Sequence, residues 1–531
     1  MTTTAPVDTL TRDALTVLQP GFHGTTAPDW LLRRIGEGLG AVALFARNID
    51  RPEQLAALTA RLRAEQPELI VAADEEGGDV TRLEAGTGSS FPGNLALGAV
   101  DDPHLTRAVA RELGRMLAAC GVTLDWAPSA DVNSDPRNPV IGVRSFGSDP
   151  QLVARHTAAW VEGLQSAGVA ACAKHFPGHG DTSVDSHHAL PRVLADPETL
   201  RSRELVPFAA AVAAGAKAVM SAHILVPALD PGRPATLSPA VLHDLLRRPV
   251  AEGGLGHDGL IVTDGMEMKA VSATWGIERG TVLALAAGAD AICVGGGLAD
   301  EATVLRLRDA VVRAVRTGEL AEERLADAAA RVRDLGAWSA AQAAARTAAQ
   351  AAAHPGDGAG DGGGEEIGLV AARRALRITA ARPFEPVRSA PYVLALTPVT
   401  NIAVGDGTPW GVAAELDRLL PGTEVRRVGA EEAEPEALPG LMAQVLPAAS
   451  DRRTVAVVRD LHRHRWMART VAALLRERPD TIVVEMGVPR AAPAGALHIA
   501  THGAARVCGR AAAEVITGRT GQPHDGEGGP R

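Results

Sequence analysis

The sequence predicts an α/β protein, with an N-terminal (β/α)8 TIM-type barrel followed by a smaller C-terminal α/β sandwich domain. Over the first part of the chain, short apolar runs alternate with longer amphipathic stretches, which is typical of parallel strands joined by helices. A Gly- and Asp-rich segment then breaks the pattern, and a second alternating series follows it. We therefore divide the chain into a barrel domain at residues 1–345, a flexible linker at 346–366, a C-terminal α/β domain at 367–518 and a disordered tail at 519–531.

The individual strands follow from the apolar runs. Eight runs, enough for a complete barrel, are expected to form the barrel strands: 17–22, 42–45, 69–73, 122–126, 169–173, 218–220, 260–263 and 291–294. Four more are expected in the second domain, at 392–396, 423–428, 454–458 and 481–486, with a final helix at 503–517.

Composition excludes several classes of function. The chain has 531 residues, of which 46% are hydrophobic and 22% charged, so it can bury a large core. A net charge of -10, without a basic stripe, argues against a nucleic-acid partner. No apolar run reaches the roughly 18–20 residues needed to span a bilayer, so no membrane partner is expected.

The cysteines and the N-terminus indicate a cytoplasmic location. Four cysteines lie far apart without a Cys-x-x-Cys pair, which favours free thiols in a reducing compartment over a zinc or redox site. The first residues lack the basic and apolar regions of a secretory signal. We expect no metal and no cofactor. His462 and His464 could suggest a metal, but a solvated loop is the better interpretation.

Reactive side chains gather where predicted barrel strands end. Asp74 follows the third strand, Lys174 and His175 the fifth, His223 the sixth and Asp264 the seventh. The carboxyl ends of barrel strands form the active face, so these residues are expected to converge on one site.

The stretch from 174 to 191 carries three further acid/base residues, Asp185, His187 and His188. Asp185 and His187 are two residues apart, so in an extended loop both side chains point the same way. The carboxylate could then hold the imidazole and keep it partly protonated, as a proton donor requires. For an isolated Asp-x-His, a polar surface loop is the commoner explanation.

Asp264 ends a buried run and precedes Gly265, which would let a ligand approach closely. An ionised carboxylate there could attack an anomeric carbon, although for an isolated Asp at such a turn a helix N-cap is the commoner role. Glu267 is a rival carboxylate, for which a capping or solvated role is expected.

Asp74 and Arg144 are candidate sugar ligands. The carboxylate of Asp74 could accept from two hydroxyl groups, while the acidic spacing around it lacks the features of a calcium loop. Arg144 offers a rigid fork of donors for sugar oxygens, or equally for a structural carboxylate.

Together these stretches resemble glycoside hydrolase family 3, and within it the β-N-acetylglucosaminidase branch of the two-domain type. The resemblance is carried by Asp-Glu-Glu-Gly-Gly at 74–78, Arg-Ser-Phe at 144–146, Lys-His-Phe-Pro-Gly-His-Gly at 174–180, Asp-Ser-His at 185–187 and Thr-Asp at 263–264. It implies that Asp264 is the nucleophile, His187 the general acid/base and Asp185 its partner. It also implies that Asp74, Arg144, Lys174 and His175 bind N-acetylglucosamine, with His223 a weaker candidate.

The resemblance implies a retaining, exo-acting enzyme that removes terminal β-linked N-acetylglucosamine from a muropeptide or a chitin fragment through a covalent glycosyl-aspartate. A neutral imidazole does not repel anions, so inorganic phosphate is an alternative acceptor. The Gly295–Gly297 turn lies where barrels often hold phosphate, although a plain loop is the commoner explanation. Further alternatives are a broad β-glucosidase, whose family members lack the Asp-Ser-His loop, a Schiff-base aldolase using Lys174, and a catalytically inactive sugar-binding protein.

Overall fold

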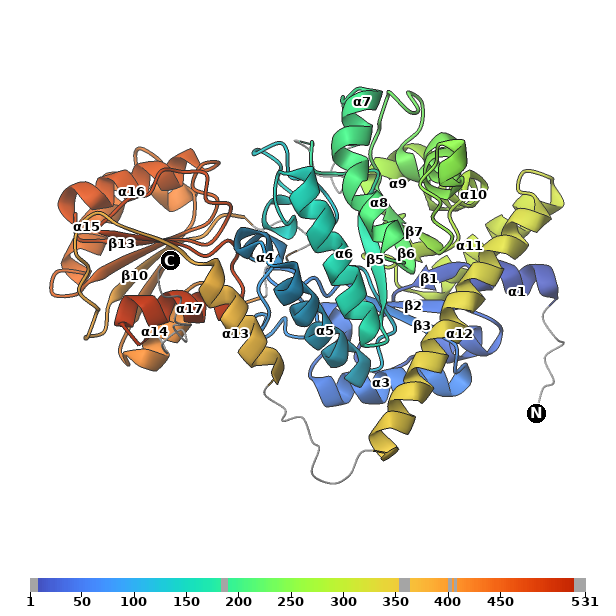
Figure 1. Cartoon of the computed structure of the whole chain (residues 1–531), viewed down its shortest axis with the longest axis horizontal. Coiled ribbons are helices and arrows are strands. Elements are labelled where there is room, and N and C mark those ends of the chain that lie inside the picture. The colour runs from blue at the N-terminus through green and yellow to red at the C-terminus, as the bar shows by residue number, and fades with distance from the viewer. Residues whose placement is uncertain (1–7, 183–189, 353–362, 400–403, 405–407, 520–531) are drawn as a thin grey trace, which may run out of the picture.

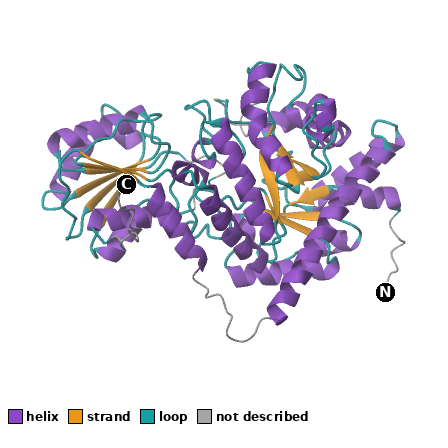
Figure 2. Ribbon diagram, in the orientation of Figure 1, coloured by secondary structure: helices purple, strands orange, loops and turns teal. Residues whose placement is uncertain are grey.

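The computed structural model describes residues 8–182, 190–352, 363–399, 404 and 408–519. Two α/β domains lie side by side, the barrel in blue to yellow and the C-terminal domain in orange to red (Figure 1). In both, strands lie inside and helices cover them (Figure 2).

In the described part of the barrel, eight strands follow one another in chain order: β1 (Leu18–Pro20), β2 (Ala41–Leu44), β3 (Ile70–Ala73), β4 (Leu124–Asp125), β5 (Ala170–Phe176), β6 (Ala218–Ser221), β7 (Leu260–Thr263) and β8 (Ile292–Val294). Strands β2 to β7 form one parallel sheet, and β1 pairs with β8. A parallel bridge from Val262 to Ala291 joins β7 to the start of β8, and β1 lies beside β2. The predicted barrel and all eight of its strands are confirmed.

Helices surround these strands, and their starts are encoded locally. Asp102 and Asp149 cap helices α5 (Pro103–Ala119) and α6 (Pro150–Ser166) by accepting from backbone N–H groups, and a proline follows each cap. Both features favour helix initiation. The other helices of this domain are α1 (Thr9–Thr16), α2 (Asp29–Gly36), α3 (Pro52–Glu65), α4 (Asn94–Val100), α7 (Pro197–Thr199), α8 (Leu205–Ala213), α9 (Lys269–Trp275), α10 (Ile277–Ala287), α11 (Glu301–Arg316) and α12 (Glu322–Ala352), with π-helical segments at Leu200–Glu204 and Ala240–Arg247.

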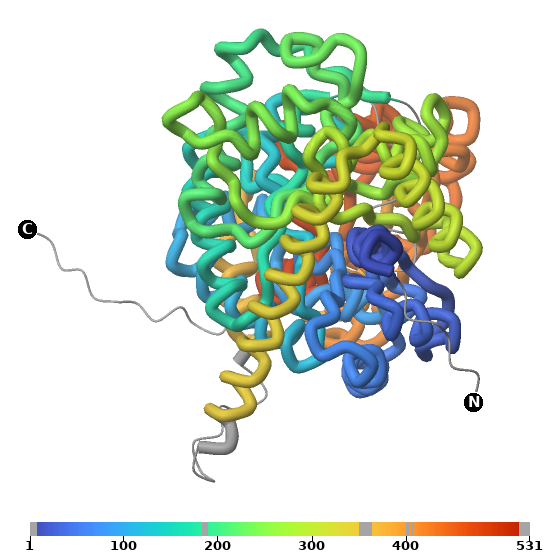
Figure 3. The backbone as a smooth tube through the Cα atoms, turned by 90° about the vertical axis from the view of Figure 1, so that its right-hand side faces the viewer, coloured from blue at the N-terminus to red at the C-terminus, as the bar shows by residue number. Residues whose placement is uncertain are grey.

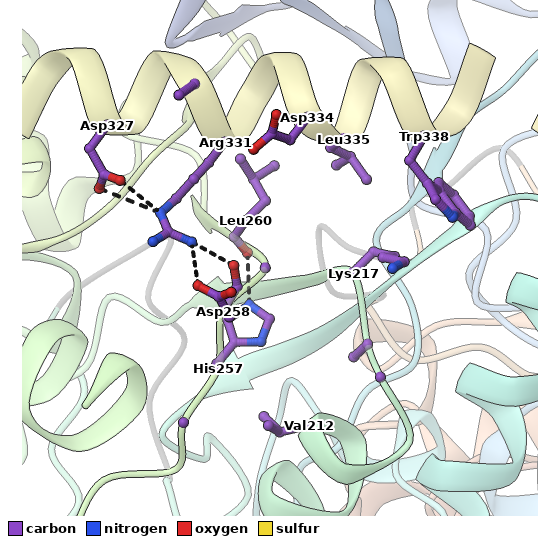
Figure 4. A pocket seen from close by; sticks show the side chains of 15 residues that line it. Val212, Lys217, His257, Asp258, Leu260, Asp327, Arg331, Asp334, Leu335 and Trp338 are labelled. Atoms are coloured by element: carbon purple, nitrogen blue, oxygen red, sulfur yellow. Dashed lines mark hydrogen bonds and ion pairs between the residues drawn. The ribbon is translucent and has the colours of Figure 1, made fainter. Parts of the chain in front are cut away.

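Helix α12 covers the amino-terminal mouth of the barrel. Its Val332 and Leu335 are buried in the cluster of apolar side chains that fills the barrel interior. Figure 3, in which the barrel faces the viewer, shows α12 crossing the front. Beside it lies a hollow of about 560 Å³, where Arg331 of α12 contacts Asp327 and Asp258 (Figure 4). Catalytic groups belong at the opposite mouth, so we assign these contacts to stability.

The C-terminal domain is a six-stranded sheet between two helical layers. Its strands are β9 (Arg377–Ala380), β10 (Tyr392–Leu396), β11 (Glu424–Val428), β12 (Thr454–Val458), β13 (Ile482–Glu485) and β14 (Leu497–Ala500), in the order β11-β10-β12-β13-β14-β9. Helices α13 (Gly363–Ala375), α14 (Ala413–Leu419) and α17 (Arg506–Thr517) pack on one face, and α15 (Leu438–Ala448) and α16 (Arg465–Glu477) on the other. The predicted α/β sandwich is confirmed.

The structure differs from the sequence predictions in three places. Lys174 and His175 lie within β5 rather than after it. Strands β9 and β14 were not predicted. Helix α12 continues to Ala352 and α13 begins at Gly363, so both ends of the predicted 346–366 linker are helical. The middle of that linker and the tail from residue 520 lie outside the described residues.

Candidate active site

Asp264 and four of the predicted sugar-binding residues line one cavity at the carboxyl ends of the barrel strands. It measures about 530 Å³, and its wall includes Asp74, Arg144, Lys174, His175 and Asp264. These side chains come from the ends of β3, β5 and β7 and from the loop after β4. Five candidates separated by up to 190 residues in the chain, from 74 to 264, therefore share one site.

Glu76, which was not predicted from sequence, forms ion pairs with both Arg144 and Lys174. Its carboxylate accepts from Arg144 Nε at 2.9 Å and Nη2 at 2.7 Å, and it lies 2.7 Å from Lys174 Nζ. Burial alone would raise the pKa of Glu76, but Arg144 and Lys174 outweigh it and hold that pKa well below its usual range. Arg144 thus has both proposed roles, because it pairs with a carboxylate and also lines the cavity.

Lys174 bridges two carboxylates. Its Nζ donates to Asp74 Oδ1 at 2.6 Å and lies against Glu76. Burial opposes the charge, yet Asp74 and Glu76 raise the pKa of Lys174 above its usual value. A lysine held charged in this way is a poor nucleophile, which argues against the aldolase alternative.

His175 is fixed by Asp131, a second residue missed from sequence. Its Nδ1–H donates to Asp131 Oδ2 at 2.8 Å, so Nε2 is the acceptor that faces Arg144 Nη2 at 3.3 Å. Asp131 also accepts from the backbone N–H of His179 at 2.6 Å. This carboxylate sets both the tautomer and the orientation of the imidazole.

Asp264 lies at the tip of β7 with its side chain half-buried at the cavity wall. The N–H of Gly265 donates to Asp264 Oδ1 at 2.7 Å, which orients the carboxylate. The next helix, α9, is capped at Met268, so Asp264 is not its N-cap. The structure therefore excludes helix capping as the role of Asp264.

His223 is placed behind the cavity wall. It is fully buried, with Nδ1 2.9 Å from Thr236 Oγ1 and Nε2 2.9 Å from Gly265 O. It is not among the described residues that line the cavity. Its contact with Gly265 supports a role in holding the Asp264 turn rather than in touching sugar.

Glu267 is half-buried at the cavity wall and is not a helix cap. Its Oε1 accepts from the backbone N–H groups of Gly295, at 3.2 Å, and Gly296. Arg47 holds the same turn by donating to the carbonyl oxygens of Gly295 and Gly296. The Glu267 carboxylate therefore already accepts hydrogen bonds from two backbone N–H groups of the turn that was considered as a phosphate site.

His179 also lines the cavity and was not predicted from sequence. It is buried, and its Nε2 has no hydrogen-bond partner among the described residues. Burial lowers the pKa of His179 to about 4, so its ring is neutral near pH 7. Asp185, His187 and His188 lie outside the described residues, so their predicted roles stay predictions.

The C-terminal domain contributes none of the described residues that line this cavity. His462 instead donates from Nε2 to Pro136 O of the barrel at 3.0 Å, and His464 precedes α16. Within the described ranges, no group of three His, Cys, Asp or Glu side chains is arranged to hold a metal ion. In the same part of the chain, no helix has the length and apolar character needed to cross a membrane.

Comparisons with known proteins agree with this architecture. The family model described as "Glycosyl hydrolase family 3 N terminal domain" matches residues 28–335. "Beta-hexosaminidase A" of Pseudoalteromonas piscicida is 35% identical over 337 residues, covering 59% of this chain and 55% of that protein. The chain thus spans about half the length of this relative.

Two solved structures are similar. A glycoside hydrolase family 3 beta-N-acetylglucosaminidase from Paenibacillus sp. str. FPU-7 is 35% identical with a TM-score of 0.83, over 97% of each chain. A Beta-N-acetylhexosaminidase from Beutenbergia cavernae is 31% identical with a TM-score of 0.56, over 63% of this chain and 100% of that one. With the family model matching more than half of the sequence, the chain belongs to glycoside hydrolase family 3.

Proposed function

We propose that this protein is a retaining, exo-acting β-N-acetylglucosaminidase that releases terminal β-linked N-acetylglucosamine from peptidoglycan or chitin fragments. Asp264 is the nucleophile, His187 the general acid/base and Asp185 its partner. The observation that carries the proposal is that Asp264 shares one cavity with the charged network of Asp74, Glu76, Arg144 and Lys174.

The network suits a sugar ring. Carboxylate oxygens of Asp74 can accept from hydroxyl groups, while Arg144, Lys174 and His175 offer a set of polar nitrogen atoms at fixed positions. Because these groups already hold one another, little side-chain entropy is lost on binding. The names of the similar proteins from Pseudoalteromonas and Paenibacillus support an N-acetylhexosaminide as the substrate class.

In the proposed reaction, Asp264 attacks the anomeric carbon as the bond from that carbon to the leaving oxygen breaks. His187 gives its proton to the leaving oxygen, and a covalent glycosyl-aspartate remains. Neutral His187 then takes a proton from water, whose oxygen attacks the same carbon and releases Asp264. Two inversions restore the β configuration.

The nucleophile is tested with a nitrophenyl N-acetyl-β-glucosaminide. Asp264→Asn is expected to lower kcat by about 10³-fold or more, because the amide cannot form the glycosyl ester. Asp258→Asn, an exposed aspartate at the opposite mouth, is the matched control and should keep full activity. NMR of the first product should show the β anomer; an initial α anomer would refute retention.

The acid/base role of His187 is tested by leaving-group dependence. His187→Ala should slow substrates with poor leaving groups far more than nitrophenyl substrates, because only the former need protonation. Equal losses across leaving groups would count against that role. Binding of N-acetylglucosamine by the wild type without turnover of any substrate would favour a non-catalytic sugar-binding protein.

The acceptor and the natural substrate are tested together. A muropeptide and chitobiose are digested with and without inorganic phosphate, and the products are identified by mass spectrometry. Free N-acetylglucosamine in both conditions is expected, since Glu267 occupies the amides of the Gly295 turn. N-Acetylglucosamine 1-phosphate as the main product would identify a phosphorylase instead.

A further inference from the structure

The loop between β3 and α4 has two faces. Asp74, Glu76, Val80 and Arg82 on this loop line the active-site cavity. Between and beyond them, other residues of the same loop contact the C-terminal domain: Asp79, Glu84, Gly88 and Ser89. A single short segment therefore connects the sugar-binding network to the second domain.

Asp79 is the centre of that contact. Its side chain is only 2% exposed and forms an ion pair with Arg459, which directly follows β12. The N–H of Ala504, beyond β14, donates to Asp79 Oδ1 at 2.7 Å. Both partners of this buried carboxylate belong to the C-terminal domain. Loss of the cation beside a buried carboxylate strongly destabilises a fold, so this ion pair is expected to stay formed.

Backbone hydrogen bonds close the turn that joins Asp79 to Glu76, which lies three residues earlier in the chain. The N–H of Glu76 donates to Val80 O at 3.1 Å, and the N–H of Val80 donates to Gly77 O at 3.3 Å. Residues 76–80 thus form a closed turn with Glu76 and Val80 at its two ends and Asp79 within it. Gly77 and Gly78 have φ values of 68° and 63°, a conformation that few other residues adopt.

We propose that Arg459 is a positioning residue for the active site: by holding Asp79, it fixes the turn that places Glu76 against Arg144 and Lys174. The proposal rests on the sugar-binding role of that network proposed above. Arg459 reaches no sugar itself, since it is not among the described residues that line the cavity. Its guanidinium lies over the ring of Trp410, with Cζ 5.9 Å from the ring centroid.

The second domain therefore has a role in this chain although it provides none of the described cavity wall. The Beutenbergia cavernae relative corresponds over its whole length to 63% of this chain, too little for both domains. A barrel of this family can thus exist without the second domain. In the present chain, Asp79 is buried against that domain, so its turn depends on partners that a lone barrel would lack.

The test compares full-length variants by steady-state kinetics. Arg459→Met keeps the bulk of the side chain and removes its charge; we expect KM for the nitrophenyl N-acetyl-β-glucosaminide to rise about tenfold, with kcat changed less than about threefold. Asp79→Asn should raise KM similarly, and the double variant should be no worse than either single one, because both remove the same contact. Arg459→Lys should recover part of the loss.

The matched control is Arg373→Met, which removes an ion pair with Glu514 inside the C-terminal domain. It is expected to leave KM unchanged. A KM for Arg459→Met equal to that of the wild type, or an equal rise in Arg373→Met, would overturn the proposal.

A second measurement does not depend on catalysis. Hydrogen exchange followed by mass spectrometry should show faster exchange in peptides that cover residues 76–83 in Arg459→Met, with the Gly295 turn unchanged. If the wild type proved inactive on N-acetylglucosaminides, the proposed function would fail, while this result would still decide whether Arg459 holds the turn. Unchanged exchange at 76–83 would refute the positioning role.

Discussion

At the scale of single residues, Glu76 joins two cations of the site, Arg144 and Lys174. It is 3% exposed and neutralises two cations at once. We expect Glu76→Gln to raise KM at least about tenfold and to destabilise the fold by about 3–5 kcal/mol, because two buried cations lose their shared anion. Steady-state kinetics and denaturant unfolding measure the two effects. Glu68→Gln, an exposed glutamate, is the control.

A small effect of Glu76→Gln on both quantities would show that Asp74 alone suffices to balance Lys174 and Arg144. A loss of stability with unchanged KM would restrict Glu76 to a structural role.

The raised pKa of the neighbouring Glu75 is expected to make the free energy of unfolding depend on pH. Glu75 is fully buried, and burial raises its pKa to about 7. Between pH 4.5 and 7 the folded state therefore keeps a proton that the unfolded chain loses. The free energy of unfolding must then fall as pH rises through this window, by at most about 3 kcal/mol from this group.

Glu75→Gln should remove that part of the decline. The glutamine can keep an oxygen on the N–H groups of Arg82 and Leu83, which donate to Glu75 Oε2 at 2.8 and 2.9 Å. Denaturant unfolding at pH 5 and pH 8 measures the difference. If the variant loses as much stability between these pH values as the wild type, another group causes the decline.

The residue scale also shows what sequence could predict in the site. Asp74, Lys174, His175 and Asp264 were found because each lies at or next to the end of an apolar run, where a barrel places its active face. Glu76 and Asp131 were missed because their importance lies in contacts with Arg144 and His175, residues far away in the chain. Acidic residues near strand ends were visible, but spacing does not say which cation each one meets.

At the scale of elements, two kinds of ion pair attach α12 to the barrel. Asp290 is fully buried, accepts from Arg324 of α12 at 2.5 Å, and also pairs with Arg247 at 2.6 Å. Arg331 instead pairs with Asp258, whose side chain is 94% exposed. Burial should decide which pair matters, because solvent screens the exposed one.

We therefore expect Asp290→Ala to lower the free energy of unfolding by about 3–5 kcal/mol and Arg331→Ala by less than about 1 kcal/mol. Denaturant unfolding of both variants under the same conditions measures the contrast. Equal losses would mean that α12 is held mainly by the apolar contacts of Val332 and Leu335.

Elements were predicted best where burial gives an apolar pattern. All four residues of β9 are exposed, and this strand pairs antiparallel at the edge of its sheet, so its sequence lacks the apolar run of a central strand. β14 is buried but only four residues long and interrupted by His498. Lys174 and His175 extend β5 because buried carboxylates compensate their polarity, which a hydropathy pattern does not reveal.

At the scale of the whole molecule, the two domains meet through the carboxyl edge of the C-terminal sheet and through α13. The residues that follow β12 and β14 hold Asp79 of the barrel. Helix α13 packs against α4 and α5 of the barrel and against α17 of its own domain. It thus links both domains, and its packing should set how firmly they dock.

Gly368 of α13 makes that packing testable. A Cβ atom there would lie 2.0 Å from the carbonyl oxygen of Ser90, which belongs to the barrel backbone. At Gly364, one turn earlier, a Cβ would meet the edge of the Phe91 ring at 3.3 Å and Glu112 Cβ at 4.0 Å. Gly368→Ala must push α13 away from the barrel, whereas Gly364→Ala requires a slight shift of the Phe91 ring.

In a helix, alanine is favoured over glycine by up to about 1 kcal/mol. Gly364→Ala should therefore be neutral or stabilising, while Gly368→Ala should destabilise by about 1–3 kcal/mol because overpacking outweighs that gain. Thermal unfolding of both full-length variants measures the difference in sign. If Gly368→Ala stabilised the protein as much as Gly364→Ala, α13 would not pack as closely on Ser90 as the structure shows, and the domains would be held together mainly by their other contacts, such as those of Asp79.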